Sequence, residues 1–184
     1  AEGGQMIDTV STRFGATDQA SLARVEDELG RRFDASADTL GRLASQVAAT
    51  RDLVRAAPHD ASAARRLFDA LDRALPDEAA GSTGITVYDP ANVPLAWSGR
   101  VSELLKERIS GETALFVAPG ALGPQLVRVE PIVDRDRPAS PRLGTIVVEQ
   151  LLGQVRGAPS LADTFVVSTS LVPVSLRARL GATT

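Results

Sequence analysis

The residue types that carry most metal chemistry are scarce in this chain. Cysteine is absent, and the only histidine, His59, lies between Pro58 and Asp60 in a sequence typical of a turn. A metal site needs several ligands together, so one isolated histidine predicts no metal centre. Asp134 and Asp136 alternate with arginines, a pattern more typical of a solvated loop than of a calcium site. We expect neither a metal nor another cofactor.

Motifs for nucleophilic catalysis and for phosphate binding are also missing. Ser98-Gly99 lacks the surrounding GxSxG pattern of a nucleophile elbow. Neither GxxxxGK[ST] nor GxGxxG occurs. The sequence offers no catalytic residues, and we expect a non-enzymatic chain.

A few aromatic and cationic side chains are candidates for lining a ligand pocket: Tyr88, Trp97, Arg100, Phe116 and Arg128. Trp97, the lone tryptophan, would form a pocket wall, and Arg100 would pair with an anionic group. The alternative is that Trp97 is buried in the core and Arg100 is a solvated strand end. Arg128 lines a pocket only if its face of the sheet is the one that the short helix after Arg100 covers. Otherwise that face of the sheet is expected to be exposed to solvent.

Length and charge limit the class of protein. At 184 residues the chain can form one ordinary domain or a small domain with a helical extension. A net charge of −3 argues against nucleic acid as a partner. No apolar run approaches the roughly 18 residues that a membrane helix needs. A start at Ala1 within an apolar pattern indicates a fragment of a longer protein, so membrane segments are expected outside it.

Apolar residues spaced three and four apart predict a long amphipathic helix from near Met6 to Ala57. Such a helix would be about 75 Å long, more than a small core can cover, so its surplus needs a partner. Glycines along it also permit a kink or an early start near Thr17. The C-terminal part of the stripe is expected to face the domain body: Leu40, Leu43, Val47 and Val54. The earlier part is the predicted seam of a homodimer: Leu22, Val25, Leu29 and Phe33.

A second helix is predicted from a cap at Asp60 or Ser62 to Leu75. The stretch Gly84–Arg100 then predicts a β-hairpin whose turn is Asp89-Pro90-Ala91-Asn92. After the hairpin, Ser102 is expected to cap a short helix, and Gly111 to end it in left-handed geometry. The inward residues of that helix are predicted to be Leu104, Leu105 and Ile109.

Three further strands are predicted at residues 114–118, 125–133 and 143–151, and short links make the sheet antiparallel. The last of them is the most apolar and is expected to be central. Residues 165–167 and 171–174 predict an extended return along the body. The fold class is α+β, with a long N-terminal helix backing a five-stranded antiparallel sheet. We expect a helical region, 1–83, and a sheet region, 84–184, that together form one domain.

Three phrases, ITVYDPANVPLAWSGR, LVRVEPIV and RLGTIVVEQLL, together with the order of elements, carry a resemblance. The chain resembles the extracytoplasmic PAS-like sensor domains, also called PDC or Cache domains, of bacterial membrane-bound histidine kinases. The phrase STSLVPVSLRARLG is similar to a stretch that leads to a membrane segment. The arginine and aromatic signature by which some of these domains hold amino acids is not evident here.

This resemblance implies a PAS-like sheet, a periplasmic location, flanking membrane helices, and signal transduction in a two-component system. The expected homodimer follows from the surplus apolar stripe of the long helix, and the identity of any small-molecule ligand stays open. Alternatives are the sensor domain of a chemoreceptor or of a cyclic-di-nucleotide enzyme, a cytoplasmic PAS-like regulatory domain, and a non-binding structural module that only dimerises.

Overall fold

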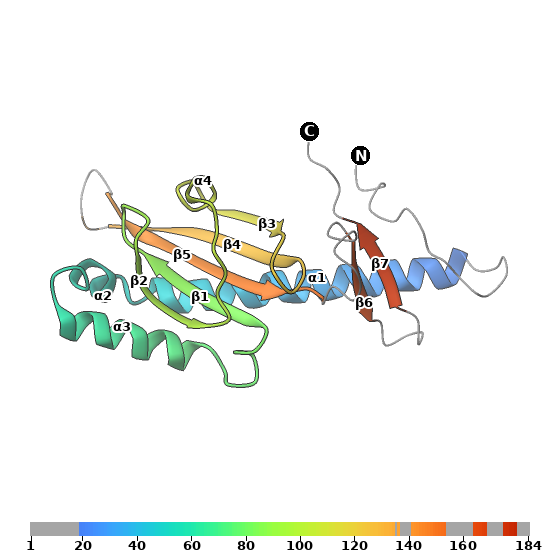
Figure 1. Cartoon of the computed structure of the whole chain (residues 1–184), viewed down its shortest axis with the longest axis horizontal. Coiled ribbons are helices and arrows are strands. Elements are labelled where there is room, and N and C mark those ends of the chain that lie inside the picture. Colours follow the sequence, from blue (N-terminus) through green and yellow to red (C-terminus); the bar gives the residue numbers. More distant parts are fainter. Residues whose placement is uncertain (1–18, 135, 137–140, 154–163, 169–174, 180–184) are drawn as a thin grey trace. The chain divides into compact units, whose positions relative to one another are not determined.

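The computed structural model describes residues 19–134, 136, 141–153, 164–168 and 175–179 (Figure 1). The chain divides into two compact units. The larger unit consists of Ser36–Ala118 and Leu126–Gln150, and the other described residues belong to the smaller one. Helices and sheet share the larger unit, and no boundary falls at residues 83 and 84.

Three helices precede the sheet: α1 (Gln19–Ala48), α2 (Arg51–Ala56) and α3 (Ala61–Ala74). The prediction of one continuous helix to Ala57 is wrong, because α1 ends at Ala48. Both the backbone N–H and the hydroxyl of Thr50 donate to the carbonyl of Val47, at 2.9 and 2.7 Å, and this local turn replaces helical bonding. The part predicted from Met6 to Asp18 lies outside the described residues.

The start of α3 is as predicted. Asp60 has extended backbone geometry, and its carboxylate accepts a hydrogen bond from the backbone N–H of Ser62 at 2.8 Å. This side-chain acceptor satisfies one of the free N–H groups of the first turn. The apolar stripe of α3 is buried through Leu67 and Leu71, both 0 % exposed.

The larger unit contains a five-stranded antiparallel sheet in the order β2-β1-β5-β4-β3. Its strands are β1 (Thr83–Tyr88), β2 (Pro94–Gly99), β3 (Ala114–Ala118), β4 (Gln125–Val133) and β5 (Arg142–Leu151). The predicted α+β class, the five strands and the central place of the last strand are confirmed. From Ser36 onwards α1 runs behind the sheet in the view of Figure 1.

The β1–β2 turn forms as its residues dictate. The Asp89 carboxylate accepts hydrogen bonds from the backbone N–H groups of Ala91 and Val93, both at 2.8 Å. Asn92 adopts a left-handed φ of 61°, which this residue type tolerates.

The two faces of the sheet bury different residues. A Cβ added to Gly41 of α1 would lie 3.7 Å from the Arg128 guanidinium, so α1 covers the face that carries Arg128. Val127 and Val129, which alternate with Arg128 along β4, are on the opposite face. There they form a buried cluster: Tyr88, Ile109, Val127, Val129 and Val147, with Leu104, Phe116 and Ala118 packed against it.

The short helix α4 (Lys106–Ile109) differs from its prediction at both ends. Ser102 does not cap it, since the N-cap position is Leu105 and no side chain bonds there. Ile109 is buried as expected and Leu104 partly so, but Leu105 is 72 % exposed. The C-cap is Ser110 in right-handed geometry, so the left-handed cap predicted at Gly111 is also wrong.

In the smaller unit, β6 (Thr164–Ser168) and β7 (Ser175–Arg179) form a separate two-stranded antiparallel sheet. The extended conformation predicted at residues 165–167 is therefore present. This segment pairs with β7 and not with the five-stranded sheet. The extended segment predicted at 171–174 lies outside the described residues.

Candidate functional site

The predicted pocket residues do not form one site. Tyr88 is 7 % exposed within the cluster opposite α1, and Phe116 of β3 packs against that cluster. The Arg108 guanidinium of α4 lies 5.1 Å from the centre of the Phe116 ring. These two aromatic residues are the pair that the structure brings together.

Trp97 and Arg100 lie elsewhere, at the β2 edge. Trp97 is 49 % exposed, so the alternative prediction that it is buried in the core is wrong. Its ring meets Phe68 of α3 edge-on, with centroids 5.1 Å apart. A single large ring on an edge strand can pack sideways against a helix without being enclosed. Arg100 is exposed, as the solvated strand end would be.

Arg128 is on the α1 side of the sheet and not on the side that α4 covers, so it cannot share a pocket with Tyr88. Its Nε lies 3.2 Å from a carboxylate oxygen of Glu130, and both side chains are 27 % exposed. The condition under which Arg128 joins a site with the short helix is therefore not met.

The face opposite α1 contains a buried acid that the candidate list missed. Glu149 of β5 is 2 % exposed. The backbone N–H of Ser102 donates to its Oε1 at 2.5 Å, and the Ser102 hydroxyl contacts its Oε2. Burial raises the pKa of Glu149, and the two Ser102 contacts offset this only in part. The signal was a glutamate inside the apolar run LGTIVVEQLL, two residues from Val147 on the same strand face.

The charge of Glu149 acts on the phenol of Tyr88. Burial raises the pKa of the Tyr88 phenol, the negative charge of Glu149 raises it further, and a hydrogen bond with Thr86 lowers it. Thr86 pairs with Val147 across β1 and β5, so the three polar side chains share one sheet face. The face is thus mostly filled by apolar side chains, and Thr86, Tyr88 and Glu149 are polar side chains among them.

A cavity lies on the other face of the sheet. Its volume is about 340 Å³, within the usual range for small-molecule sites. We call it the α1 groove, and its walls are the end of α1 with the start of α2, and the last part of β4: Ser45, Ala48, Ala49, Arg51, Glu130, Pro131, Ile132 and Val133.

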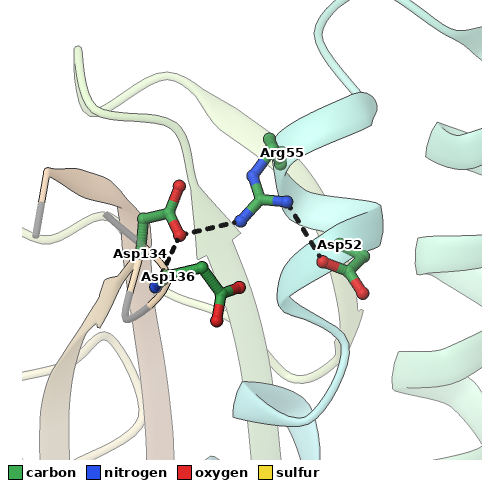
Figure 2. Close-up of polar contacts among 4 residues, drawn as sticks. All are labelled: Asp52, Arg55, Asp134 and Asp136. Atoms are coloured by element: carbon green, nitrogen blue, oxygen red, sulfur yellow. Dashed lines mark hydrogen bonds and ion pairs between the residues drawn. The ribbon is translucent and has the colours of Figure 1, made fainter. Parts of the chain in front are cut away.

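Two arginines one helical turn apart, Arg51 and Arg55, differ in their partners, and Figure 2 shows those of Arg55. The Arg55 guanidinium lies between two carboxylates: its NH1 is 3.3 Å from Oδ1 of Asp52, and its NH2 is 3.0 Å from Oδ1 of the buried Asp134. The Asp134 carboxylate also accepts a hydrogen bond from the backbone N–H of Asp136 at 3.2 Å. The guanidinium of Arg51, in contrast, makes no ion pair or hydrogen bond to any described residue. The α1 groove therefore presents a positive charge that is not neutralised locally.

No family model matches the chain, and no curated protein matches it by sequence. Within the described residues, no helix has the length and apolar character needed to cross a bilayer. The same residues contain no group of three or more acidic or histidine side chains placed to hold a metal ion.

Proposed function

We propose that this chain is a PAS-like (PDC or Cache) extracytoplasmic sensor domain of a bacterial transmembrane histidine kinase, which regulates kinase output through α1. The proposal is supported by a five-stranded antiparallel sheet whose first and last strands, β1 and β5, are neighbours, and by the part of α1 from Ser36 onwards, which covers one of its faces. A PAS-like domain is expected to combine these features.

The observation that carries the proposal is the position of the α1 groove. One of its walls is the last turn of α1, so an occupant touches the helix itself. The same helix continues towards its N-terminus into the smaller unit, beyond Ser36. A ligand that binds one arrangement of α1 more tightly than another shifts the balance between them by its difference in affinity. Direct contact between ligand and helix supplies such a difference.

The lining of the α1 groove favours a small organic carboxylate as ligand. The Arg51 guanidinium can bind a carboxylate through two parallel hydrogen bonds, and the Ser45 hydroxyl adds a donor. Pro131 and Ile132 offer apolar surface to a short hydrocarbon body. The negative charge of Glu130 is offset by Arg128, which lowers its repulsion of an anion.

A homodimer is part of the proposal, with its seam on the N-terminal part of α1. Phe33 is 40 % exposed and Leu29 is half-buried. The side chains of Leu22 and Val25, the other predicted seam residues, lie outside those that the structure describes. Analytical ultracentrifugation of the chain should show a dimer that Phe33→Ser weakens. A monomer at high concentration would contradict the seam.

A thermal-shift screen of the purified chain against small mono- and dicarboxylates, with amino acids and nucleobases as other classes, tests the sensing function. A ligand at a hundredfold excess over its Kd stabilises the folded chain by about 2.7 kcal/mol, a readily visible shift. We expect carboxylates to raise the Tm, and Arg51→Ala to abolish the effect while Arg66→Ala, a change to an exposed arginine of α3, preserves it. A screen without any stabilising compound, or shifts insensitive to Arg51→Ala, would contradict binding in this groove.

The second candidate is a structural module that only dimerises. The buried cluster around Tyr88 and Val127 favours it, because apolar side chains pack that face of the sheet. A chain that dimerises but binds no compound of the screen would be this module. A chemoreceptor or a cyclic-di-nucleotide enzyme as the parent protein would use the same sensor in the same way, and the identity of the output domain distinguishes them.

A further inference from the structure

The segment that joins β2 to β3, residues 100–113, crosses the sheet face opposite α1, and we call it the strap. It contains α4. Its residues Leu104 and Ile109 pack on the buried cluster formed by Tyr88, Val127, Val129 and Val147. The strap therefore covers the apolar face of the sheet, and what fastens it decides whether that face is covered.

One fastening is the side chain of Arg142, at the start of β5. Its NH2 donates to the carbonyl of Ile109 at 2.8 Å, and its NH1 to those of Ser110 and Gly111 at 2.7 and 2.9 Å. The guanidinium also donates to the Thr145 hydroxyl, and this contact orients the arginine side chain. An arginine stays charged at all relevant pH values, so this end of the strap is held independently of pH.

The other fastening is the carboxyl group of Glu149, at the far end of the same strand. Both of its oxygens contact Ser102, one through the backbone N–H and one through the hydroxyl. The group is 2 % exposed and makes no ion pair with any described residue. Keeping an ionised carboxylate in such a place is costly, because burial removes its water and no cation replaces it.

The charged and titratable groups around Glu149 do not offset this cost. From β1, the phenol of Tyr88 faces the Glu149 carboxyl group. The residue that pairs with Glu149 across β1 and β5 is Gly84, which has no side chain. In the strap, Arg100 and Glu103 flank Ser102, but both are exposed. On β5 itself, Arg142 is engaged with Thr145 and the α4 carbonyls.

A protonated Glu149 can keep both contacts with Ser102. A neutral carboxylic acid retains an oxygen that accepts from the backbone N–H, and its own O–H can donate to the hydroxyl oxygen of Ser102. Protonation thus removes the buried charge without breaking the fastening.

We propose that the strap is a proton-controlled cover: it is closed over the Tyr88 cluster when Glu149 is protonated, and it loosens at its Ser102 end, pivoting on Arg142, when Glu149 is ionised. This device is independent of the α1 groove and stands even if the domain binds no small molecule. It would make the exposure of the apolar face respond to the acidity of the surroundings.

The direction follows from linkage. The pKa of Glu149 in the closed strap is raised by burial above that of a solvated glutamate in the open strap. Protonation of Glu149 therefore stabilises the closed strap fully at pH values below the pKa of the solvated glutamate. This stabilisation is lost as pH rises through the raised pKa of Glu149 in the closed strap. Between these limits the opening equilibrium changes tenfold for each unit by which the two pKa values differ.

Amide hydrogen exchange of residues 100–113, followed by mass spectrometry from about pH 5 to pH 8, tests the proposal, because burial raises the pKa of Glu149 above its usual value. After correction for intrinsic exchange, wild-type protection should fall as pH rises. Glu149→Gln keeps an acceptor and a donor for Ser102 without the charge, so its strap should stay protected at every pH. Glu103→Gln removes an exposed strap carboxylate and should behave as wild type.

Protection that does not change with pH in the wild type, or that changes equally in Glu149→Gln, would overturn the proposal. A second variant keeps the test valid if Glu149→Gln does not fold. Ser102→Ala removes one contact to the carboxylate, and it should loosen the strap more at pH 8 than at pH 5. Equal loosening of the strap at the two pH values would also overturn the proposal.

Discussion

Gly84→Ala is expected to displace the strap from the sheet. Gly84 lies in β1 opposite Glu149 of β5, and the start of the strap passes directly over it. A Cβ at residue 84 would be 1.9 Å from the carbonyl oxygen of Arg100 and 2.9 Å from the backbone nitrogen of Val101. Both are backbone atoms, so no side-chain rotation can relieve the contact, and the strap itself must move.

The size of the effect follows from overpacking and from the loss of a hydrogen bond. Forcing atoms into a packed interior costs about 1–3 kcal/mol, and here the contact is with backbone, so the upper end applies. Moving the strap also weakens the bond from Ser102 to the Glu149 carboxyl group, and a typical hydrogen bond is worth about 0.5–1.5 kcal/mol. We expect Gly84→Ala to lower the free energy of unfolding by about 3 kcal/mol or more.

Urea denaturation measures this change, with Gly81→Ala as the matched control. A Cβ at residue 81 would meet nothing within 4 Å. That variant should be neutral or more stable by about 0.4–1 kcal/mol, because alanine restricts the unfolded chain. If Gly84→Ala were as stable as Gly81→Ala, the close approach of the strap to β1, and with it the fastening at Glu149, would be refuted.

Three further predictions concern the core, the ion pair and the pH response. Leu71→Ala, at a fully buried position of α3, should cost about 2–5 kcal/mol in thermal or urea unfolding, and a smaller loss would mean that α3 is not packed on the sheet. Arg55→Ala should cost about 1–3 kcal/mol because it removes an ion pair of the buried Asp134, whereas Asp52→Ala, at an 82 % exposed partner, should cost about 0.5 kcal/mol or less. Equal effects would contradict the pairing in Figure 2. Glu149→Gln should be more stable than wild type at pH 8 and the difference should shrink towards pH 4, since the raised pKa of Glu149 costs the wild-type fold stability only when the group is ionised; a difference that grows in acid would contradict this sign.

The elements set by local chemistry could be predicted closely from the sequence. Asp89 and Asn92 define the hairpin turn, Asp60 caps α3, and the apolar run of β5 indicates its central place in the sheet. In each case the residue types act on their own backbone or on adjacent positions. Such short-range effects are legible in a single sequence.

The features that depend on contacts between distant residues were not predictable in the same way. Ser102 reads as a helix cap, but its hydrogen bonds go to Glu149, 47 residues later. The end of α1 depends on a competing turn at Thr50, whose sequence also permits helix. The α1 groove joins Arg51 to Glu130, which no spacing along the chain connects. The predicted pocket residues shared chemistry but not a face of the sheet, which is why Arg128 and Tyr88 lie apart.

The most direct test of the central claim is amide hydrogen exchange along α1, measured with and without a mixture of small carboxylates. If an occupant of the α1 groove acts on this helix, protection of residues 43–48 should rise with the mixture present, and Arg51→Ala should remove the increase. Exchange of α1 that is identical in the two samples would contradict the account, because a sensor that works through this helix must change it when its ligand binds.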